Sequence, residues 1–340
     1  MASTTPTLQP SPGSTAAASP ASGGRSRNRP DPRREASTRV IVVALAANLA
    51  IAAAKFVAAF VTGSSALLAE AFHSVADSGN EILLGVATVR GGRPPDERHP
   101  FGFGREAYFW SLIAAVAVFV GGALLSVREG IEALLKPTDT SSYLAGYVVL
   151  AVAFTLDGIS FRQAYKQLRA EAKELGRDFG THFELTSDPV TRAVFLEDGA
   201  ALTGTTVAFA GLVLRQLTHS FVPDAVAAIV IGGLLGFVAV QLAGRNRDFL
   251  VGEQAPEVLK ESVRRTILDQ PGVVGVNELL MTFVGPRRVW VVSRVDVDDS
   301  LHGDDVERLV RDTEERLLDV SPIIVRADIV TVGRIRADGD

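Results

Sequence analysis

The 340-residue sequence contains no cysteine and only 2 methionines and 2 tryptophans. The absence of cysteine excludes a disulfide framework, a thiolate metal site and a cysteine nucleophile. An excess of positive charge is also absent, because 39 acidic and 34 basic residues give a formal net charge of -5. This balance argues against a general nucleic-acid binder.

Hydrophobic residues are abundant, at 47% of the chain, although 21% of the residues are charged. The mean hydropathy of +0.23 means that the charges are separated from long apolar runs. Each run is close to the roughly 20 residues that cross a bilayer as a helix, so we expect six transmembrane helices. These apolar runs are 40–61, 66–89, 107–127, 143–161, 190–214 and 223–243.

Basic residues alternate between the connections, which sets the expected orientation. The segments before the first run, after the second, after the fourth and after the sixth are rich in Lys and Arg, whereas the other two connections are poor. Because basic loops stay on the cytoplasmic side, we expect both termini in the cytoplasm. The expected location is a bacterial inner membrane.

The chain divides into three expected parts. Residues 1–38 are rich in Pro, Ser, Ala and Arg and predict a disordered basic cytoplasmic tail, and residues 39–248 hold the six spans. Residues 249–335 predict helix, strand, strand, helix, strand, which favours a small antiparallel sheet covered by helices on one face. About eighty residues make a marginal core, so we expect a homodimer.

The second run carries ionisable residues, at a spacing that suits a metal site. His73 and Asp77 are four residues apart and share one helix face, which Asn80 extends by a turn. An imidazole and a carboxylate placed in this way can bind one divalent cation. The alternative is a hydrogen-bonded His–Asp pair that only ties helices together.

The fourth and fifth runs add three acids. Asp157 lies in the fourth, and Glu197 and Asp198 are adjacent in the fifth. Adjacent helical residues point about 100° apart, so at most one of the pair is expected to face a given site well. A cation, a proton or a basic neighbour must compensate these acids. Lys55 in the first run is expected to snorkel or to pair with an acid.

The loop after the second run reads DERHPFGFGREAYF and brings Asp96 and His99 within three residues of each other. A weak or transient metal site there is one interpretation, and a solvated cytoplasmic loop is the other. The glycines of this loop lack the strand and helix context of a phosphate-binding loop, so no nucleotide site is expected.

These features together resemble the cation diffusion facilitator family, and the LEDGAALTG and DGISF stretches resemble its zinc-transporter-nine-like branch. The resemblance implies a homodimeric antiporter that exports divalent cations in exchange for protons, with no enzymatic activity and no prosthetic group. Zinc is the expected cargo, with manganese, iron, cobalt and cadmium as alternatives. The resemblance also implies a cytoplasmic ferredoxin-like domain.

The family's tetrahedral transport site would use His73 and Asp77 on span two and Asp198 on span five. The fourth position falls on Val194, which cannot ligate, so Glu197, Asp157, Asn80 or water must replace it. Asp96 and His99 match part of the family's loop site. The rival functions are an importer or channel without proton coupling, and a metal sensor that signals through the C-terminal domain.

Overall fold

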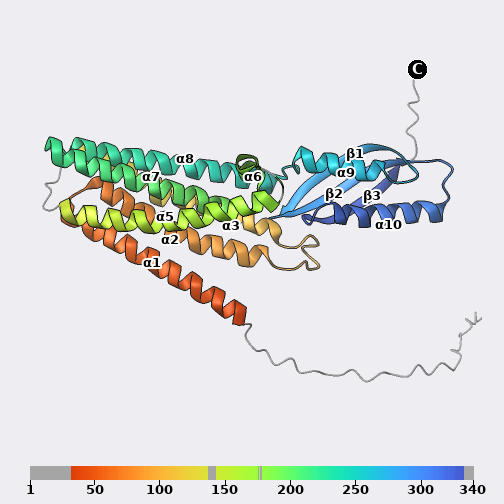
Figure 1. Cartoon of the computed structure of the whole chain (residues 1–340), viewed down its shortest axis with the longest axis horizontal. Coiled ribbons are helices and arrows are strands. Elements are labelled where there is room, and N and C mark those ends of the chain that lie inside the picture. The colour runs from red at the N-terminus through yellow and green to blue at the C-terminus, as the bar shows by residue number, and fades with distance from the viewer. Residues whose placement is uncertain (1–31, 137–142, 175, 177, 333–340) are drawn as a thin grey trace, which may run out of the picture. The chain divides into compact units, whose positions relative to one another are not determined.

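The structure is a computed structural model that describes residues 32–136, 143–174, 176 and 178–332 (Figure 1). Most of the predicted tail, residues 1–31, lies outside the described residues, and the first helix begins at Pro32, within the range predicted to be disordered. The helices are α1 (Pro32–Thr62), α2 (Ser65–Gly91), α3 (Gly104–Val118), η1 (Phe119–Leu124), α4 (Leu125–Leu135), α5 (Tyr143–Glu174), α6 (Phe179–Leu185), α7 (Pro189–Thr218), α8 (Val222–Val251), α9 (Glu257–Leu268) and α10 (Gly303–Val320).

Among the described residues, four helical segments are long and apolar enough to cross a membrane: Gly104–Leu135, Tyr143–Lys173, Pro189–Thr218 and Val222–Val251. The first and second of the expected six spans fall short of this standard. In α1 the described apolar part is only Asn48–Thr62, and α2 carries three acids and an arginine among its apolar residues. The fold is therefore that of a helical membrane protein, with four spans supported by composition.

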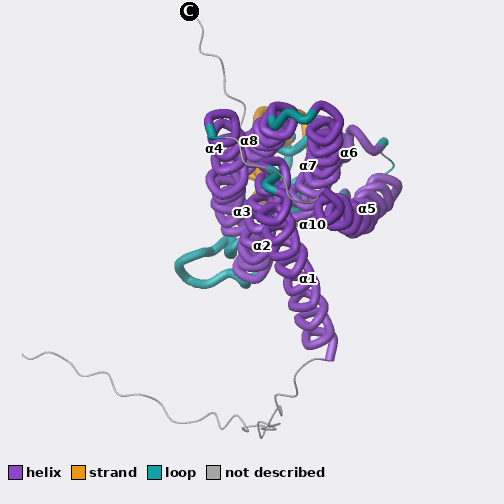
Figure 2. The backbone as a smooth tube through the Cα atoms, turned by 90° about the vertical axis from the view of Figure 1, so that its left-hand side faces the viewer, coloured by secondary structure: helices purple, strands orange, loops and turns teal. Residues whose placement is uncertain are grey.

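Small residues line the contacts between the helices, and Figure 2 shows α2, α3, α7 and α8 close together. The buried cluster of this part is dominated by alanine. At Gly232 an added Cβ would lie 2.8 Å from the carbonyl oxygen of Ala123, so α8 approaches the end of η1 at backbone distance. Helices in a bilayer gain stability from such close packing, because lipid supplies no hydrophobic driving force between them.

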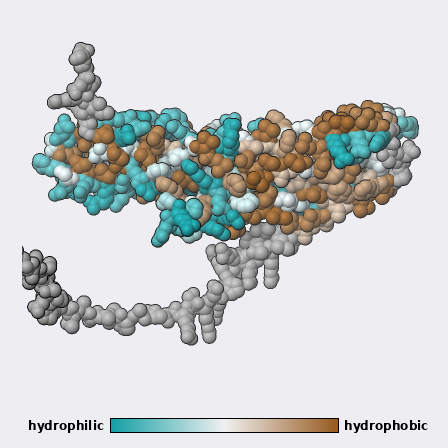
Figure 3. All heavy atoms as spheres, turned by 180° about the vertical axis from the view of Figure 1, so that it is seen from behind, coloured by the Kyte–Doolittle hydropathy of each residue, from teal (hydrophilic) through white to brown (hydrophobic). Residues whose placement is uncertain are grey.

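Large apolar side chains point outward from the same helices. Phe60 is 77% exposed and Val240 is 64% exposed. Figure 3 shows hydrophobic surface gathered over the helices and hydrophilic surface around the strands. Exposed apolar residues of this extent require a non-aqueous surrounding, which agrees with a position in the bilayer.

The third span contains a π-helical segment that its sequence did not reveal. Phe119–Leu124 forms η1 between α3 and α4, and its glycines face α2. A Cβ at Gly122 would lie 3.3 Å from Leu235 and 3.5 Å from Ala76. One turn of wider helix is therefore placed against the helix that carries His73 and Asp77, as is common near functional sites.

The C-terminal part has the predicted order of helix, two strands, helix and strand, namely α9, β1 (Val273–Gly285), β2 (Arg288–Val297), α10 and β3 (Ile324–Val332). The sheet order is β1-β2-β3. The expected fully antiparallel sheet is wrong, because β1 and β2 pair antiparallel whereas β2 and β3 pair parallel. The reason is the connection: α10 returns the chain to the starting end of β2, and such a crossover produces parallel strands.

An aromatic contact joins the third span to the sheet. The ring of Tyr108 stacks on Phe249 at 4.9 Å, and Phe283 of β1 meets Phe249 edge-on at 5.3 Å. Next to this stack, Gly104 at the start of α3 lies against the β1–β2 turn, where an added Cβ would be 2.5 Å from the carbonyl oxygen of Val284. The close approach therefore requires glycine at position 104.

Substitution of Gly104 by alanine is expected to lower the thermal unfolding temperature of the purified protein in detergent. The methyl group would overlap backbone atoms of Val284 and Gly285, which cannot rotate away, at a cost of about 1–3 kcal/mol. The matched control is Gly79→Ala, since no atom lies within 4 Å of a Cβ there. An equal unfolding temperature for the two variants would contradict this account of the junction.

Candidate functional site

One cavity gathers most of the acids that the sequence singled out. It lies between α1, α2, α5 and α7, and each of these helices contributes polar side chains to its wall. Three of the acids present a buried oxygen with no hydrogen-bond partner in the described part of the chain: Asp77, Asp157 and Glu197. The cavity is lined by Asn48, Ile51, Ser74, Asp77, Glu81, Leu156, Asp157, Ser160, Val194, Glu197, Asp198 and Ala201.

His73 lies beside the cavity and is fully buried. Its Nδ1 is 3.3 Å from Oδ1 of Asp77, yet neither ring nitrogen has a hydrogen-bond partner among the described residues. Two ligand atoms of a tetrahedral Zn²⁺ with bonds of about 2.0–2.1 Å lie about 3.3–3.4 Å apart. This separation is compatible with two ligands of one ion, and no hydrogen bond joins the two side chains in the described part of the chain.

The two adjacent acids of α7 both reach the cavity, contrary to the expectation that only one would face a site. Glu197 accepts a hydrogen bond from the side-chain amide of Asn80, across the α2–α7 contact. Asp198 accepts a hydrogen bond of 2.7 Å from the hydroxyl of Ser160 on α5. The cavity is broad enough for both Glu197 and Asp198 to line it, although their side chains point in different directions. Each acid accepts a hydrogen bond from a different residue.

Asp157 and Val194 line the same cavity. Val194 precedes Asp198 by one helical turn, so the position that would hold a fourth ligand on this helix presents an apolar side chain to the site. Asp157 presents its unpartnered Oδ2 from α5. Of the groups predicted as replacements, Asn80, Asp157 and Glu197 each keep one buried oxygen without a hydrogen-bond partner in the described part of the chain.

No group of three or more His, Asp or Glu side chains in the described ranges is close enough to hold a metal ion as it stands. The candidate ligand side chains therefore lie around one cavity, but they do not all point at one position. Asn80 and Ser160 hold two of the acids by hydrogen bonds. Side-chain rotation at these two acids would be needed to close a coordination sphere.

A buried ion pair lies close to His73, since Glu70 precedes it by three residues on α2. Lys55 is fully buried and its Nζ is 2.9 Å from Oε2 of Glu70 and 2.8 Å from the hydroxyl of Ser74. Thr205 of α7 donates to the same carboxylate oxygen at 3.1 Å. The expectation that Lys55 pairs with an acid is confirmed, and the pair joins α1, α2 and α7 through a single carboxylate.

The predicted loop pair is in contact but exposed. Nδ1 of His99 is 2.9 Å from Oδ1 of Asp96, and about half of each side chain is in solvent. The ring of Phe103, which cannot ligate a metal ion, packs against His99 at 4.2 Å. This geometry favours the interpretation as a solvated loop over a metal site.

The same loop touches the sheet. Phe101 packs on Trp290 at 4.5 Å, and the guanidinium of Arg326 lies over both rings. Arg326 also donates to Asp328, and this hydrogen bond holds the pKa of the Asp328 carboxyl below its usual range. The loop that follows α2 is therefore attached to the sheet by aromatic and cation–π contacts.

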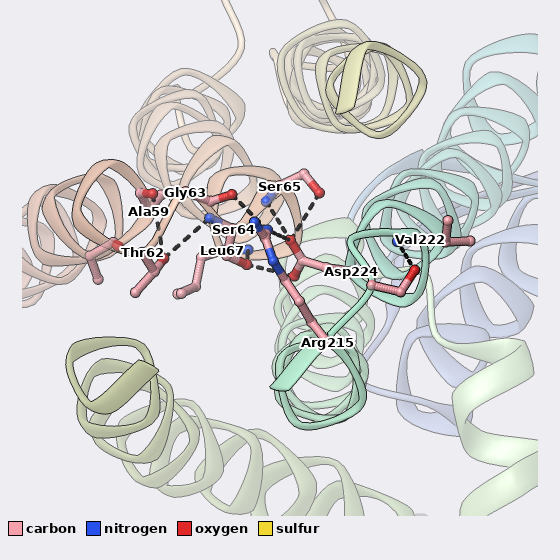
Figure 4. Close-up of polar contacts among 11 residues, drawn as sticks. Ala59, Thr62, Gly63, Ser64, Ser65, Leu67, Arg215, Val222 and Asp224 are labelled. Carbon is pink, nitrogen blue, oxygen red and sulfur yellow. Dashed lines mark hydrogen bonds and ion pairs between the residues drawn. The ribbon is translucent and has the colours of Figure 1, made fainter. Parts of the chain in front are cut away.

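A charged network joins the ends of α1, α2, α7 and α8 (Figure 4). These helix ends lie away from the cavity. Asp224, fully buried at the start of α8, accepts from the hydroxyl of Ser64 at 2.6 Å, from the backbone N–H of Ser65 at 2.8 Å and from Arg215 at 3.0 Å. Arg215 also donates to the carbonyl oxygen of Gly63 at 2.8 Å. These bonds fasten the α1–α2 turn to α7 and α8.

Sequence reasoning missed several groups of the site. Asn48 donates to Glu81 across the α1–α2 contact, and Ser74 and Ser160 supply hydroxyls. The only signal for them was a polar residue within an apolar run, which does not distinguish a site residue from a local helix contact.

The helices define a membrane protein, and the buried acids around one cavity define a class that handles cations. The transmembrane-domain model of the cation efflux family matches residues 41–251. The chain belongs to this family of transporters, the cation diffusion facilitators, and to its zinc-transporter-nine-like branch.

Three curated relatives illustrate the range of the similarity. The mitochondrial proton-coupled zinc antiporter SLC30A9 of Homo sapiens is 31% identical over 260 residues, covering 76% of this chain and 46% of the relative. Metal tolerance protein C4 of Arabidopsis thaliana is 29% identical, over 78% of this chain and 58% of the relative. The manganese efflux protein MneP of Bacillus subtilis is 23% identical, over 85% of this chain and 97% of the relative.

The chain thus spans about half the length of the first two relatives. Among solved structures, a variant of the MamM C-terminal domain matches with 19% identity, covering 23% of this chain and 94% of that chain, with a TM-score of 0.22. The family assignment rests on the membrane part.

Removal of one partner of the Lys55–Glu70 pair is expected to destabilise the protein strongly. Lys55→Met leaves a buried carboxylate without its cation, at a cost of about 3–5 kcal/mol. The double variant Lys55→Met/Glu70→Gln should recover most of this loss, because no buried charge remains. Thermal and chemical unfolding in detergent measures both.

The control is Lys136→Met, because this lysine is 80% exposed and should contribute little. A single variant at Lys55 that unfolds like the wild type would show that the pair is not needed for stability.

Proposed function

We propose that this protein exports a divalent metal cation, zinc first, across a membrane in exchange for protons. The observation that carries the proposal is the cavity between α1, α2, α5 and α7, whose wall includes Asp77, Asp157, Glu197 and Asp198, beside the buried imidazole of His73. Uncompensated acids within membrane helices are costly, so a cation or protons must neutralise them in each state. The family membership supports the proposal.

Proton exchange follows from the chemistry of these ligands. An imidazole or a carboxylate binds a metal ion only after it has lost its proton, so metal and protons compete for the same atoms. His73, Asp77 and Asp198 would take up protons on the side where the ion is released. Loss of these protons on the other side would restore the site for the next ion.

The donor set suits zinc, and a second cation is also supported. One imidazole with several carboxylates is a mixed nitrogen and oxygen site, which Zn²⁺ accepts at about 2.0–2.2 Å. The many oxygens also suit Mn²⁺, which prefers carboxylate ligands, and the manganese efflux protein MneP is a relative. Manganese is therefore the second candidate cargo.

The remaining parts of the proposal concern topology and assembly. We place six spans in the membrane, with α1 and α2 completing the four more apolar ones and with both termini in the cytoplasm of a bacterial cell. Residues 1–38, 39–248 and 249–335 are the proposed tail, membrane domain and cytoplasmic domain. The last of these would pair with a second copy to form a homodimer.

Movement between inward-open and outward-open states would rearrange the helices around the cavity. The network of Asp224 and Arg215 ties the α1–α2 turn to α7 and α8 at one end of these helices. Opening there would require these hydrogen bonds to break. An importer or channel would use the same cavity but would not depend on protons.

The variant Asp77→Asn is expected to lose metal flux while it still folds. The amide keeps the size of the side chain but cannot neutralise a cation, so cation affinity should fall by about 10–100-fold or more. Zinc uptake into vesicles that contain purified protein, with an imposed pH gradient, measures the flux. Glu132→Gln, an exposed acid at the end of α4, is the matched control.

Flux of Asp77→Asn near that of the wild type would refute the site assignment. Wild-type flux that is unchanged when the pH gradient is removed would instead leave the site in place and reject proton exchange in favour of the channel or importer. A response of the cell to metal that persists when flux is abolished would favour the sensor.

The variant Val194→His is expected to tighten zinc binding. Position 194 lies in the cavity wall, one turn before Asp198, so an imidazole there would add a nitrogen ligand to the site. Calorimetric titration of the purified protein with Zn²⁺ measures the affinity. Val190→His, one turn further from Asp198, is the control, and unchanged affinity in Val194→His would show that another group already fills this position.

A further inference from the structure

A second histidine is buried outside the cavity described above. His182 of α6 is 4% exposed, and neither of its ring nitrogens has a hydrogen-bond partner within the described ranges. It faces a separate cavity whose wall is formed by Glu171 near the end of α5, by Ser187, and by Leu259 and Phe283 of the C-terminal part. A buried imidazole without a protein partner is unfavourable, so this histidine is available to bind a group in the cavity.

The position of Glu171 indicates what that group is. Its Oε2 lies 3.4 Å from Nε2 of His182. This is longer than a good hydrogen bond of about 2.7–3.2 Å. It equals the separation of about 3.3–3.4 Å between a nitrogen and an oxygen ligand of one tetrahedral ion with bonds of about 2.0–2.1 Å. The side chain of Glu171 is 21% exposed, which leaves access for an ion and for water ligands.

The histidine is also held in place before any ligand binds. Arg192 donates to the carbonyl oxygen of Phe183 at 3.3 Å, and Arg245 donates to that of Glu184 at 2.9 Å. Both guanidinium groups thereby fix α6 to α7 and α8. The backbone that carries His182 is therefore fixed, which lowers the conformational entropy lost when its side chain binds a ligand.

The carboxylate beside His182 favours a cation. Arg287 lines the same cavity, and an anion bound between it and His182 would have to lie beside the carboxylate of Glu171. A divalent transition-metal ion is attracted by that carboxylate and accepts the imidazole nitrogen, which suits zinc and its neighbours. With two protein ligands and water in the remaining positions, the site is expected to be weaker than the one between the membrane helices.

We propose that His182 and Glu171 bind one divalent transition-metal cation, completed by water, where α5 and α6 meet the C-terminal part. Glu171 follows Asp157 by 14 residues on α5, so the two sites are about 21 Å apart. The bound ion would tie α5 to α6 and so to α7, which carries Asp198. That the ion bound here is the same metal as the transported one rests on the proposed function.

The test uses the full-length protein in detergent, with Co²⁺ as an optical probe and Zn²⁺ in equilibrium dialysis. The background variant Asp77→Asn/Asp198→Asn removes the cavity site. In this background we expect a Co²⁺ absorption band and one equivalent of Zn²⁺ per chain that are lost on His182→Gln and weakened on Glu171→Gln. His219→Gln, an exposed histidine that directly follows α7, should leave both unchanged.

Equal zinc stoichiometry and an equal Co²⁺ band in the His182→Gln and His219→Gln proteins would overturn the proposal. Folding is checked separately, because Zn²⁺ should raise the unfolding temperature of the background protein but not that of its Glu171→Gln variant, whose changed side chain is partly exposed. A water bridge between His182 and Glu171 would give no metal-dependent shift, and this result also rejects the site.

Failure of this proposal can be told from failure of the proposed function by zinc flux in the wild type. Flux without His182-dependent binding rejects only the second site. His182-dependent binding without flux keeps the second site and rejects export.

Discussion

The high cost of placing charge in a bilayer governs the arrangement of the membrane part. The buried ionisable groups described above have either a compensating partner or a place at a cavity. Lys55 and Glu70 form a closed pair, with hydroxyls from Ser74 and Thr205 around it. Oε1 of Glu70 has no hydrogen-bond partner in the described part of the chain, and the same is true of Oδ1 of Asp77 at the cavity. The difference is that the charge of Glu70 is compensated by Lys55, whereas the charge of the acids at the cavity must be compensated by a bound cation or by protons.

The two kinds of site share helices, and this links stability to binding. Ser74 bonds Lys55 and also lines the cavity, one residue after His73. Thr205 bonds Glu70 from α7, about two turns after Asp198. The Lys55–Glu70 pair therefore ties together three of the helices that line the cavity.

Much of this could be predicted from the sequence where a periodic pattern carried the information. The four-residue spacing of His73 and Asp77 placed them on one face, and the order of helices and strands in the C-terminal part was right. The parallel pairing of β2 and β3 was missed because alternation along a strand says nothing about its neighbour. The reach of both Glu197 and Asp198 depends on the width of a cavity between four helices, and His182 stood alone in the sequence without a motif.

Asp224 gives the helix bundle a fixed point. Both oxygens of its carboxylate are used by the α1–α2 turn and Arg215, so the first residues of α2 cannot shift without α7 and α8. If α2 tilts about this point, the displacement of a residue grows with its distance along the helix axis. Asp77 lies 12 residues beyond Ser65, or about 18 Å, so a tilt of about 10° would move its carboxylate by about 3 Å. At Gly91 the same tilt amounts to about 7 Å. A small rotation about one buried carboxylate is therefore sufficient to move Asp77, an acid of α2 at the cavity, by about 3 Å.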